Sequence, residues 1–273
     1  MIGNDIYWLF NSLRSKFESA KEKYERERGT AQYLLVSPTN CGRTWLRLIL
    51  GKSFQLYFQL PETINLFYLY GFSEINSTIP SIKVSHERYK RYQEYRYRRI
   101  ILLVRDPRDA VVSKYFGLIR RLQKQQKIDE SEMSLFDYFQ QEGLRYYLSF
   151  YNEWNQHKSE TMGILLVRYE DLKENPHQEV KKIVKFMGLE IPDRIIRTAV
   201  EYASFDNMRK METQGQSMSA VLKPGNPQDS ESYKTRKGKV GGFKEYLSVE
   251  EIALIEKDIN DTLDSYYGYN YYS

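Results

Sequence analysis

The apolar residues of the chain gather in four short runs, and each run is followed by a loop and then by a helical pattern. The runs show little of the polar alternation that marks a strand with one face in water, so they predict strands buried on both faces. Such strands interleaved with helices favour a parallel sheet covered by helices on both sides. The expected strands are Tyr33–Val36, Ile82–Val84, Ile100–Val104 and Ile164–Val167.

Helical patterns and one long irregular stretch complete the predicted elements. Residues 1–28 are expected to hold an N-terminal helix, from about Asp5, whose charged second half forms a solvated face. Residues 206–235 are rich in Gly, Pro, Ser and charge without a period, which predicts a lid or binding loop. No linker separates two cores, so we expect a single α/β domain over residues 1–273. The other expected helices are Thr44–Leu60, Ala110–Gln125, Ser134–Trp154, Pro176–Met187 and Val249–Leu263.

The composition narrows the class of protein. Hydrophobic residues make up 41% and charged residues 28% of the 273 positions, which is enough for a sizeable core. No apolar run approaches the roughly 20 residues of a membrane-spanning helix, and the N-terminus lacks a secretory pattern, so we expect a cytoplasmic protein that binds no membrane. The net charge of +5 suits anionic ligands but is too small to indicate nucleic acid. Cys41 is the only cysteine and there are three histidines, so we expect neither an intrachain disulfide nor a metal.

The loop after the first strand has the features of a phosphate-binding turn. Residues 37–45 lead from a strand directly into a helix, whose free backbone N–H groups and dipole favour an anion. Gly42 allows close approach of the backbone, and Arg43 and Thr44 add a charge and a hydroxyl. The first glycine of the nucleotide-binding motif G-x-x-x-x-G-K-[ST] is replaced by Ser37, so an ordinary strand–loop–helix corner stays open as an alternative.

Two further loops carry cations. Arg105 ends the third strand and Ser113 lies two helical turns later, so the pair could hold one phosphate, although a capping network around Arg105 is an equal alternative. Residues 235–244 hold four cations and three glycines, a composition that could wrap an anion or form a solvated basic loop.

Together and in this order, the three loops resemble those of the sulfotransferase family that uses 3′-phosphoadenosine 5′-phosphosulfate (PAPS), above all its cytosolic small-molecule branch. The first resembles the family's phosphosulfate loop T-Y-P-K-S-G-T-T-W, the second its R-N-P-K-D-x-x-V-S motif and the third its R-K-G-x-x-G-D-W-K motif. Val167–Leu172 and Ser204–Met208 resemble the family's Y-E-D-L and S-F-x-x-M segments, and the likeness spans about residues 33–247.

The resemblance implies a fold related to P-loop NTPases and a reaction in which a sulfuryl group passes from PAPS to a hydroxyl or amine of a small-molecule acceptor, leaving PAP, without a metal. It also implies a role for each matching residue. The phosphosulfate would be surrounded by Cys41, Gly42, Arg43, Thr44 and Trp45, the 3′-phosphate by Arg105, Ser113, Arg236, Lys237 and Gly238, and the adenine by Trp45, Tyr169, Phe205 and Met208.

His86 and Asn40 bear on catalysis. His86 ends the second strand and matches the family's K-T-H segment, whose histidine is the general base, a role that suits an imidazole near neutral pH. The lysine of the family's first loop is Asn40 here, and a second family lysine is Val84. Lys83 is adjacent, but strand alternation points it to the other face. Arg43 is therefore expected to supply the missing charge.

Two rival functions and the choice of partners stay open. A nucleotide-dependent kinase would need a lysine in the first loop and a carboxylate for Mg²⁺, for which Asp106 is available. A PAPS-binding homologue with little turnover is the second rival, because Asn40 brings no charge. The family's dimer motif is matched only in part, by Lys244, Ser248 and Val249, so a homodimer is an open expectation. The acceptor cannot be read, since its pocket would lie on variable loops.

Overall fold

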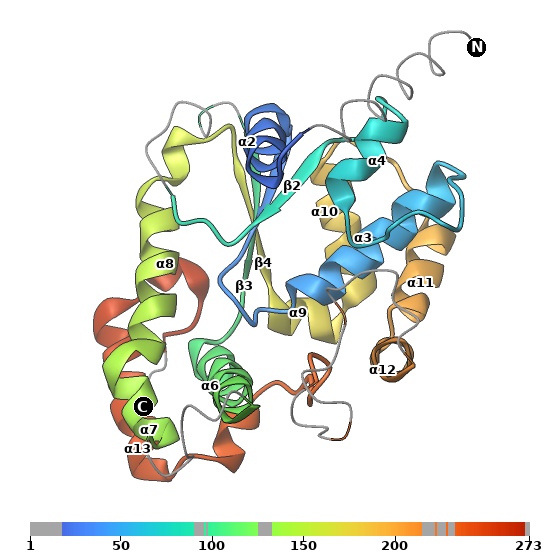
Figure 1. Ribbon diagram of the computed structural model, residues 1–273. Helices are drawn as coiled ribbons and strands as arrows, with labels where there is room; N and C mark the ends of the chain where they lie inside the picture. The colour runs from blue at the N-terminus through green and yellow to red at the C-terminus, as the bar shows by residue number, and fades with distance from the viewer. Residues whose placement is uncertain are drawn as a thin grey trace, which may run out of the picture.

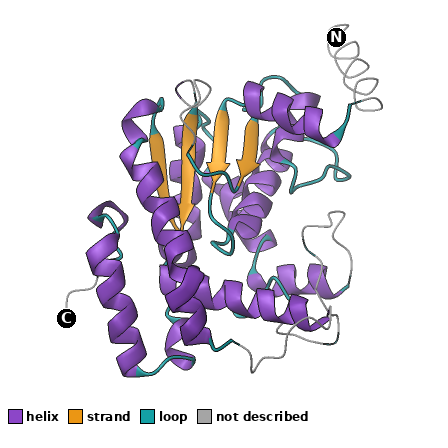
Figure 2. Ribbon diagram, turned by 60° about the vertical axis from the view of Figure 1, so that its left-hand side comes forward, coloured by secondary structure: helices purple, strands orange, loops and turns teal. Residues whose placement is uncertain are grey.

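A computed structural model of the protein describes residues 18–89, 96, 98–124, 133–214, 222, 228 and 233–270. Its centre is one sheet of four parallel strands in the order β2-β1-β3-β4, seen side by side in Figure 2. All four predicted strands are confirmed, each within one residue at either end. They are β1 (Tyr33–Val36), β2 (Ile82–Ser85), β3 (Arg99–Val104) and β4 (Ile164–Arg168).

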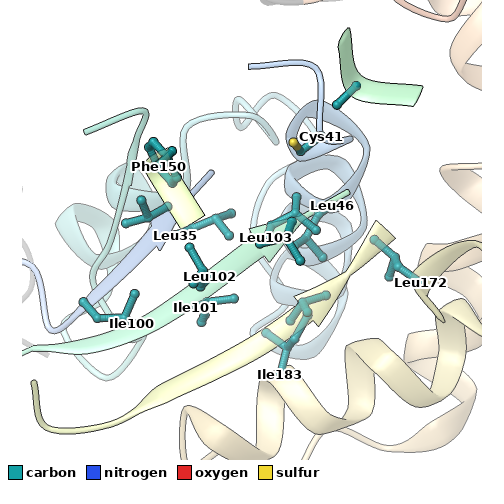
Figure 3. Close-up of a cluster of buried hydrophobic side chains, with 14 of the residues drawn as sticks. Leu35, Cys41, Leu46, Ile100, Ile101, Leu102, Leu103, Phe150, Leu172 and Ile183 are labelled. Atoms are coloured by element: carbon teal, nitrogen blue, oxygen red, sulfur yellow. The ribbon is translucent and has the colours of Figure 1, made fainter. Parts of the chain in front are cut away.

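The central strands are buried because helices cover both sides of the sheet. Every residue of β1 is buried, as is β3 from Ile100 to Val104. Leu35 of β1 pairs with Ile101 of β3, and such aliphatic pairs join the leucines and isoleucines of the neighbouring helices in a single core (Figure 3). Continuous apolar runs, rather than alternating ones, are what a doubly covered parallel sheet requires.

The covering helices form two layers, which Figure 1 shows on opposite sides of the sheet. On one side, α3 (Arg43–Tyr57) packs against α11 (Asp193–Tyr202), which in turn contacts α10 (Pro176–Phe186). On the other side, α6 (Pro107–Lys124) packs against α8 (Leu144–Gln156). The chain is therefore a single α/β domain with three layers, as predicted.

Shorter elements fill the connections between these helices and strands. The predicted helix Ser134–Trp154 is divided, because a π-helical segment interrupts it between α7 and α8. The predicted final helix is confirmed, and its start follows from a capping box of Ser248 and Glu251. These elements are α4 (Leu69–Ile75), α7 (Leu135–Tyr138), the π-helical segment Phe139–Gly143, α9 (Tyr169–Glu174), α13 (Val249–Thr262) and the 3₁₀ turns Lys158–Glu160, Gly242–Glu245 and Ser265–Tyr267.

The N-terminal helix differs from the prediction in two ways. The described part, α2, covers only Ala20–Thr30, because Ser19 has extended dihedrals and forms a capping box with Glu22. Its charged half is also not purely solvated. Glu27 is buried and lies 2.6 Å from the ammonium of Lys83, which strand β2 directs toward α2. The expectation for residues 1–17 lies outside the described residues.

The irregular stretch predicted at residues 206–235 begins with a helix instead. Helix α12 (Phe205–Thr213) occupies its first part, and Ser204 caps the helix by accepting from the backbone N–H of Asn207. The helix was not predicted because only three of its nine residues are apolar and it runs directly into a stretch rich in Gly, Pro and Ser. Most of the remaining stretch, and with it the expected lid, lies outside the described residues.

Candidate functional site

The strands end at one edge of the sheet, and the three predicted loops meet there. β1 runs into the loop that ends at Gly42, β2 into His86, β3 into Arg105 and β4 into Tyr169. The carboxyl edge of a parallel sheet is where α/β proteins bind ligands. The structure thus brings together residues that lie far apart in the sequence.

Gly42 closes the first loop in a conformation that only glycine adopts without strain. Its φ is 85°, and it lies at the N-terminus of α3 without a side-chain cap. A Cβ atom at this position would lie 2.5 Å from Cδ2 of Tyr169. The tyrosine ring therefore packs directly on the loop backbone, and the helix N-terminus is left open to an anion.

The cysteine of this loop faces the core. Its thiol is fully buried, 3.5 Å from the carbonyl of Thr39 and 3.6 Å from the hydroxyl of Tyr151, and Figure 3 shows Cys41 at the N-terminal end of α3. Burial raises the pKa of the Cys41 thiol to about 12. The side chain is thus an inert core group, and Cys41 can offer a ligand only its backbone.

Asn40 joins the first loop to the second. It has a positive φ of 62°, which asparagine tolerates better than most residues, and its side-chain amide donates to Oγ of Ser113 over 3.0 Å. Its carbonyl accepts from the guanidinium of Arg105 over 3.2 Å. Asn40 therefore has a defined position against α6.

Arg105 connects the second loop to the third. Its guanidinium donates to the carbonyl of Lys239 over 3.1 Å and lies 4.5 Å from the ring centroid of Tyr169. The side chain is buried, and the carboxylate of Asp109 approaches it to 3.9 Å. This network holds a cation at the point where all three loops meet. The contact at the start of α6 comes from Asp106 instead, whose Oδ1 accepts from the backbone N–H of Arg108 over 2.9 Å.

Two buried carboxylates that the sequence analysis did not assign hold the third loop in place. Asp109 accepts from the backbone N–H groups of Gly241 and Phe243 over 2.7 and 3.0 Å. Glu212 of α12 accepts from the backbone N–H groups of Lys234 and Thr235 over 2.7 and 3.0 Å. The sequence offers one signal for Asp109, its place in the first helical turn after Arg105, and none for Glu212, which lies within residues 206–235.

The cations of the third loop have partners of their own. Arg236 donates to the hydroxyl of Tyr246 over 2.8 Å, and Lys237 lies 2.8 Å from Glu245. Gly238 has a φ of 57°, and a Cβ atom there would lie 3.2 Å from the ring of Phe205. The loop is therefore ordered, and it packs its glycine against one of the predicted adenine-contacting residues.

The predicted adenine-contacting residues surround the same region. Trp45 and Tyr169 meet edge to face with ring centroids 6.0 Å apart, and the indole donates to the carbonyl of Ala203 over 2.9 Å. Phe205 is 37% exposed, whereas Met208 is buried. The ammonium of Lys173 lies 5.7 Å from the ring of Trp45 and 5.8 Å from that of Phe205.

His86 is held by both ring nitrogens. Its Nδ1 lies 2.8 Å from the carbonyl of Ser37, which can only accept, so the proton is on Nδ1. Its Nε2 then accepts from Nη2 of Arg43. Removal of water from the ring, followed by the positive charge of Arg43, lowers the pKa of His86 to about 4. The imidazole is therefore neutral at pH 7, with the lone pair of Nε2 occupied by Arg43.

A family model described as "Sulfotransferase domain" matches residues 30–266. The chain belongs to the sulfotransferase family. Its curated relatives include sulfotransferase 1A1 of Canis lupus familiaris, 27% identical over 59% of this chain and 53% of the relative, and cytosolic sulfotransferase 16 of Arabidopsis thaliana, 27% identical over 60% and 51%. The chain thus spans about half the length of the curated relatives it matches.

Solved structures of other proteins share the fold. The structure of mouse sulfotransferase SULT7A1 complexed with PAP superimposes with a TM-score of 0.62 at 19% identity, covering 89% of both chains. Retinol dehydratase in complex with retinol and PAP gives a TM-score of 0.58 at 17% identity, covering 88% of this chain and 85% of that one. At this identity the likeness establishes the fold, which confirms the fold class predicted from the sequence. Among the described residues, no helix is both long and apolar enough to cross a membrane.

Proposed function

We propose that the protein transfers a sulfuryl group from PAPS to a hydroxyl or amine of a small-molecule acceptor in the cytoplasm. The observation that carries the proposal is the position of Arg105, which touches the first loop at Asn40 and the third at Lys239. A buried cation at the junction of an open helix N-terminus and a glycine-rich basic loop suits a ligand with two separate phosphate groups. Family membership supplies the chemical identity of that ligand.

The 3′-phosphate of the nucleotide would lie between α6 and the third loop. Arg105, Ser113 and Arg236 would contribute side chains, while Lys237 and Gly238 would add backbone N–H groups or charge. Asp109 and Glu212 support this arrangement because they accept from backbone N–H groups of the loop and so fix its position beside α6 and α12. The adenine would lie among Trp45, Tyr169 and Phe205, with Met208 behind them.

The phosphosulfate would lie at the N-terminus of α3, where backbone N–H groups of Cys41 and Gly42 and the hydroxyl of Thr44 are available. Asn40 can donate a neutral hydrogen bond but brings no charge to the leaving phosphate. Arg43 is the nearest cation in the loop, and its planar fork can hold two oxygens of the group. Arg43 then stabilises the negative charge that develops as the sulfur–oxygen bond breaks.

His86 would act as the general base. With Nδ1–H fixed on the carbonyl of Ser37, Nε2 is the atom that takes the acceptor's proton. The lone pair becomes available when Arg43 turns from the imidazole toward the phosphosulfate. The same movement removes a positive charge from the ring, which raises the pKa of His86 and makes it a stronger base.

The test is consumption of PAPS by the purified chain with a panel of phenols, alcohols and amines, followed by mass spectrometry of PAP and of the sulfated products. We expect PAP to form in equal amount with a sulfated product for at least one acceptor. If the protein binds PAP but no acceptor of the panel is sulfated, the proposal of an active transferase is contradicted in favour of a nucleotide-binding homologue. Size-exclusion chromatography of the same sample tests the expected homodimer.

A further inference from the structure

Two arginines lie one helical turn apart on α3. Arg43 and Arg47 are separated by four residues, so their side chains lie on the same face of the helix. Burial lowers the pKa of Arg47 to about 10, and burial followed by the charge of Arg47 lowers that of Arg43 to about 10. Both guanidiniums are therefore charged at pH 7 and close enough to repel each other. Within the described part of the chain, no carboxylate pairs with either of them.

Arg47 is fixed beside the segment that leads to α4. Its Nε donates to the carbonyl of Phe67 over 2.7 Å, and its Nη2 donates to the same oxygen. The segment also lies directly on α3 one turn later, since a Cβ atom on Gly51 would lie 2.0 Å from the carbonyl oxygen of Leu66. The guanidinium is thus positioned, and its Nη1 donates to no described residue.

Several positive charges lie near His86. Nη1 of Arg43 is buried without a hydrogen-bond partner among the described residues. The charges of Arg43, Lys234 and Arg47 all act on the imidazole of His86. A buried donor without a partner and adjacent like charges both cost free energy, which a bound anion would recover.

We propose that the acceptor carries a negatively charged group, such as a carboxylate or a phosphate or sulfate ester, near its reacting hydroxyl or amine, and that Arg47 binds this group. The inference rests on the proposed function, in which Arg43 turns to the phosphosulfate. Arg47 lies about 6 Å farther along α3, a spacing of four helical residues, and donates to the carbonyl of Phe67 in the segment between α3 and α4. Arg47 is therefore a specificity-determining residue. Lys234 adds to the positive electrostatic potential around the acceptor's charged group.

The experiment compares two probes that differ in one charge. They are 4-hydroxyphenylacetate and its methyl ester, which present the same phenol. Each is titrated into the protein saturated with PAP, in a dead-end complex that needs no turnover. We expect the acid to bind at least about tenfold more tightly than the ester, as a close charge pair at a partly desolvated site allows. Equal or tighter binding of the ester, or no binding of the acid, would overturn the proposal.

Two substitutions assign the preference to Arg47. Arg47→Gln should remove most of the preference for the acid and leave the affinity for PAP nearly unchanged. Arg99→Gln is the matched control, because Arg99 also donates to a phenylalanine carbonyl, that of Phe186, but at the opposite end of the sheet. It should keep the preference. An unchanged preference in Arg47→Gln contradicts the role of Arg47.

A second variant and a PAP control cover the cases in which Arg47→Gln gives no answer. If Arg47→Gln does not fold, Lys234→Gln takes its place, since the Lys234 side chain is exposed and its substitution should still reduce the preference by a few fold. A preference that does not change in Lys234→Gln would then count against the proposal. Absence of any stabilisation by PAP would contradict the proposed function itself, whereas PAP binding without an acid preference would contradict only this inference.

Discussion

Arg43 donates to Nε2 of His86, so the cation expected to bind phosphosulfate and the expected general base are in direct contact. The contact occupies the lone pair that a base needs and brings a positive charge to the ring. It links the two functional roles, because whatever draws Arg43 away from His86 also prepares the base. The order of events would therefore be nucleotide first and proton transfer afterwards.

The first prediction concerns the titration of His86. Its imidazole should titrate near pH 4 in the free protein, well below the unfolded value of about 6.5. Because the folded pKa is the lower one, the unfolded chain binds the proton first as pH falls. Stability due to this group is therefore lost between about pH 6.5 and pH 4. Arg43→Met should raise the midpoint toward 6.5. NMR of the imidazole signals, assigned with His86→Gln, measures both values, and a wild-type midpoint near 6.5 would contradict the contact.

The second prediction concerns the charge missing at Asn40. Arg43→Ala should lower kcat by about 10²–10³-fold, the usual cost of one preorganised donor to a developing charge. Asn40→Lys should be tolerated or raise kcat, because it returns a cation to the leaving phosphate. Steady-state kinetics with saturating PAPS decide. A large rise in KM for PAPS with unchanged kcat in Arg43→Ala would mean that Arg43 contributes only to ground-state binding.

The third prediction concerns His86 as base. His86→Ala should lower turnover by about 10²-fold or more with an alcohol acceptor and leave PAP affinity nearly intact. A nitrophenol acceptor should lose less activity, since it needs little help in losing its proton. Wild-type rates with the alcohol would exclude His86 from this role.

The fourth prediction uses two glycines with positive φ. Gly42→Ala should destabilise the protein by about 1–3 kcal/mol more than Gly188→Ala, because both pay the backbone strain but only the first drives a methyl group into Tyr169. It should also weaken PAP binding, which Gly188→Ala should not. Urea unfolding and PAP titration of both variants measure the difference. Equal losses of stability would show that Tyr169 yields to the added methyl group.

Much of the fold could be read from the sequence, because apolar runs such as Ile100–Val104 have a single physical explanation in a doubly covered sheet. Helix α12 could not be predicted, since only three of its nine residues are apolar and it runs directly into a stretch rich in Gly, Pro and Ser. In the site, the residues that belong to sequence motifs could be predicted. The residues that contact them and hold them in place could not. Nothing in the local pattern shows that Asp109 would hold the backbone of Gly241, because that contact depends on how distant segments pack.

The most direct test of the central claim is the stabilisation of the protein by nucleotides that differ at the 3′ position. The claim is that Arg105 and the third loop form a 3′-phosphate site continuous with the phosphosulfate loop. PAP at 100 times its dissociation constant should stabilise the fold by about 2.7 kcal/mol. At the same concentration 5′-AMP and ATP should raise the melting temperature clearly less. Equal shifts with PAP and 5′-AMP would contradict the claim, since a site without a 3′-phosphate contact could not tell the two apart.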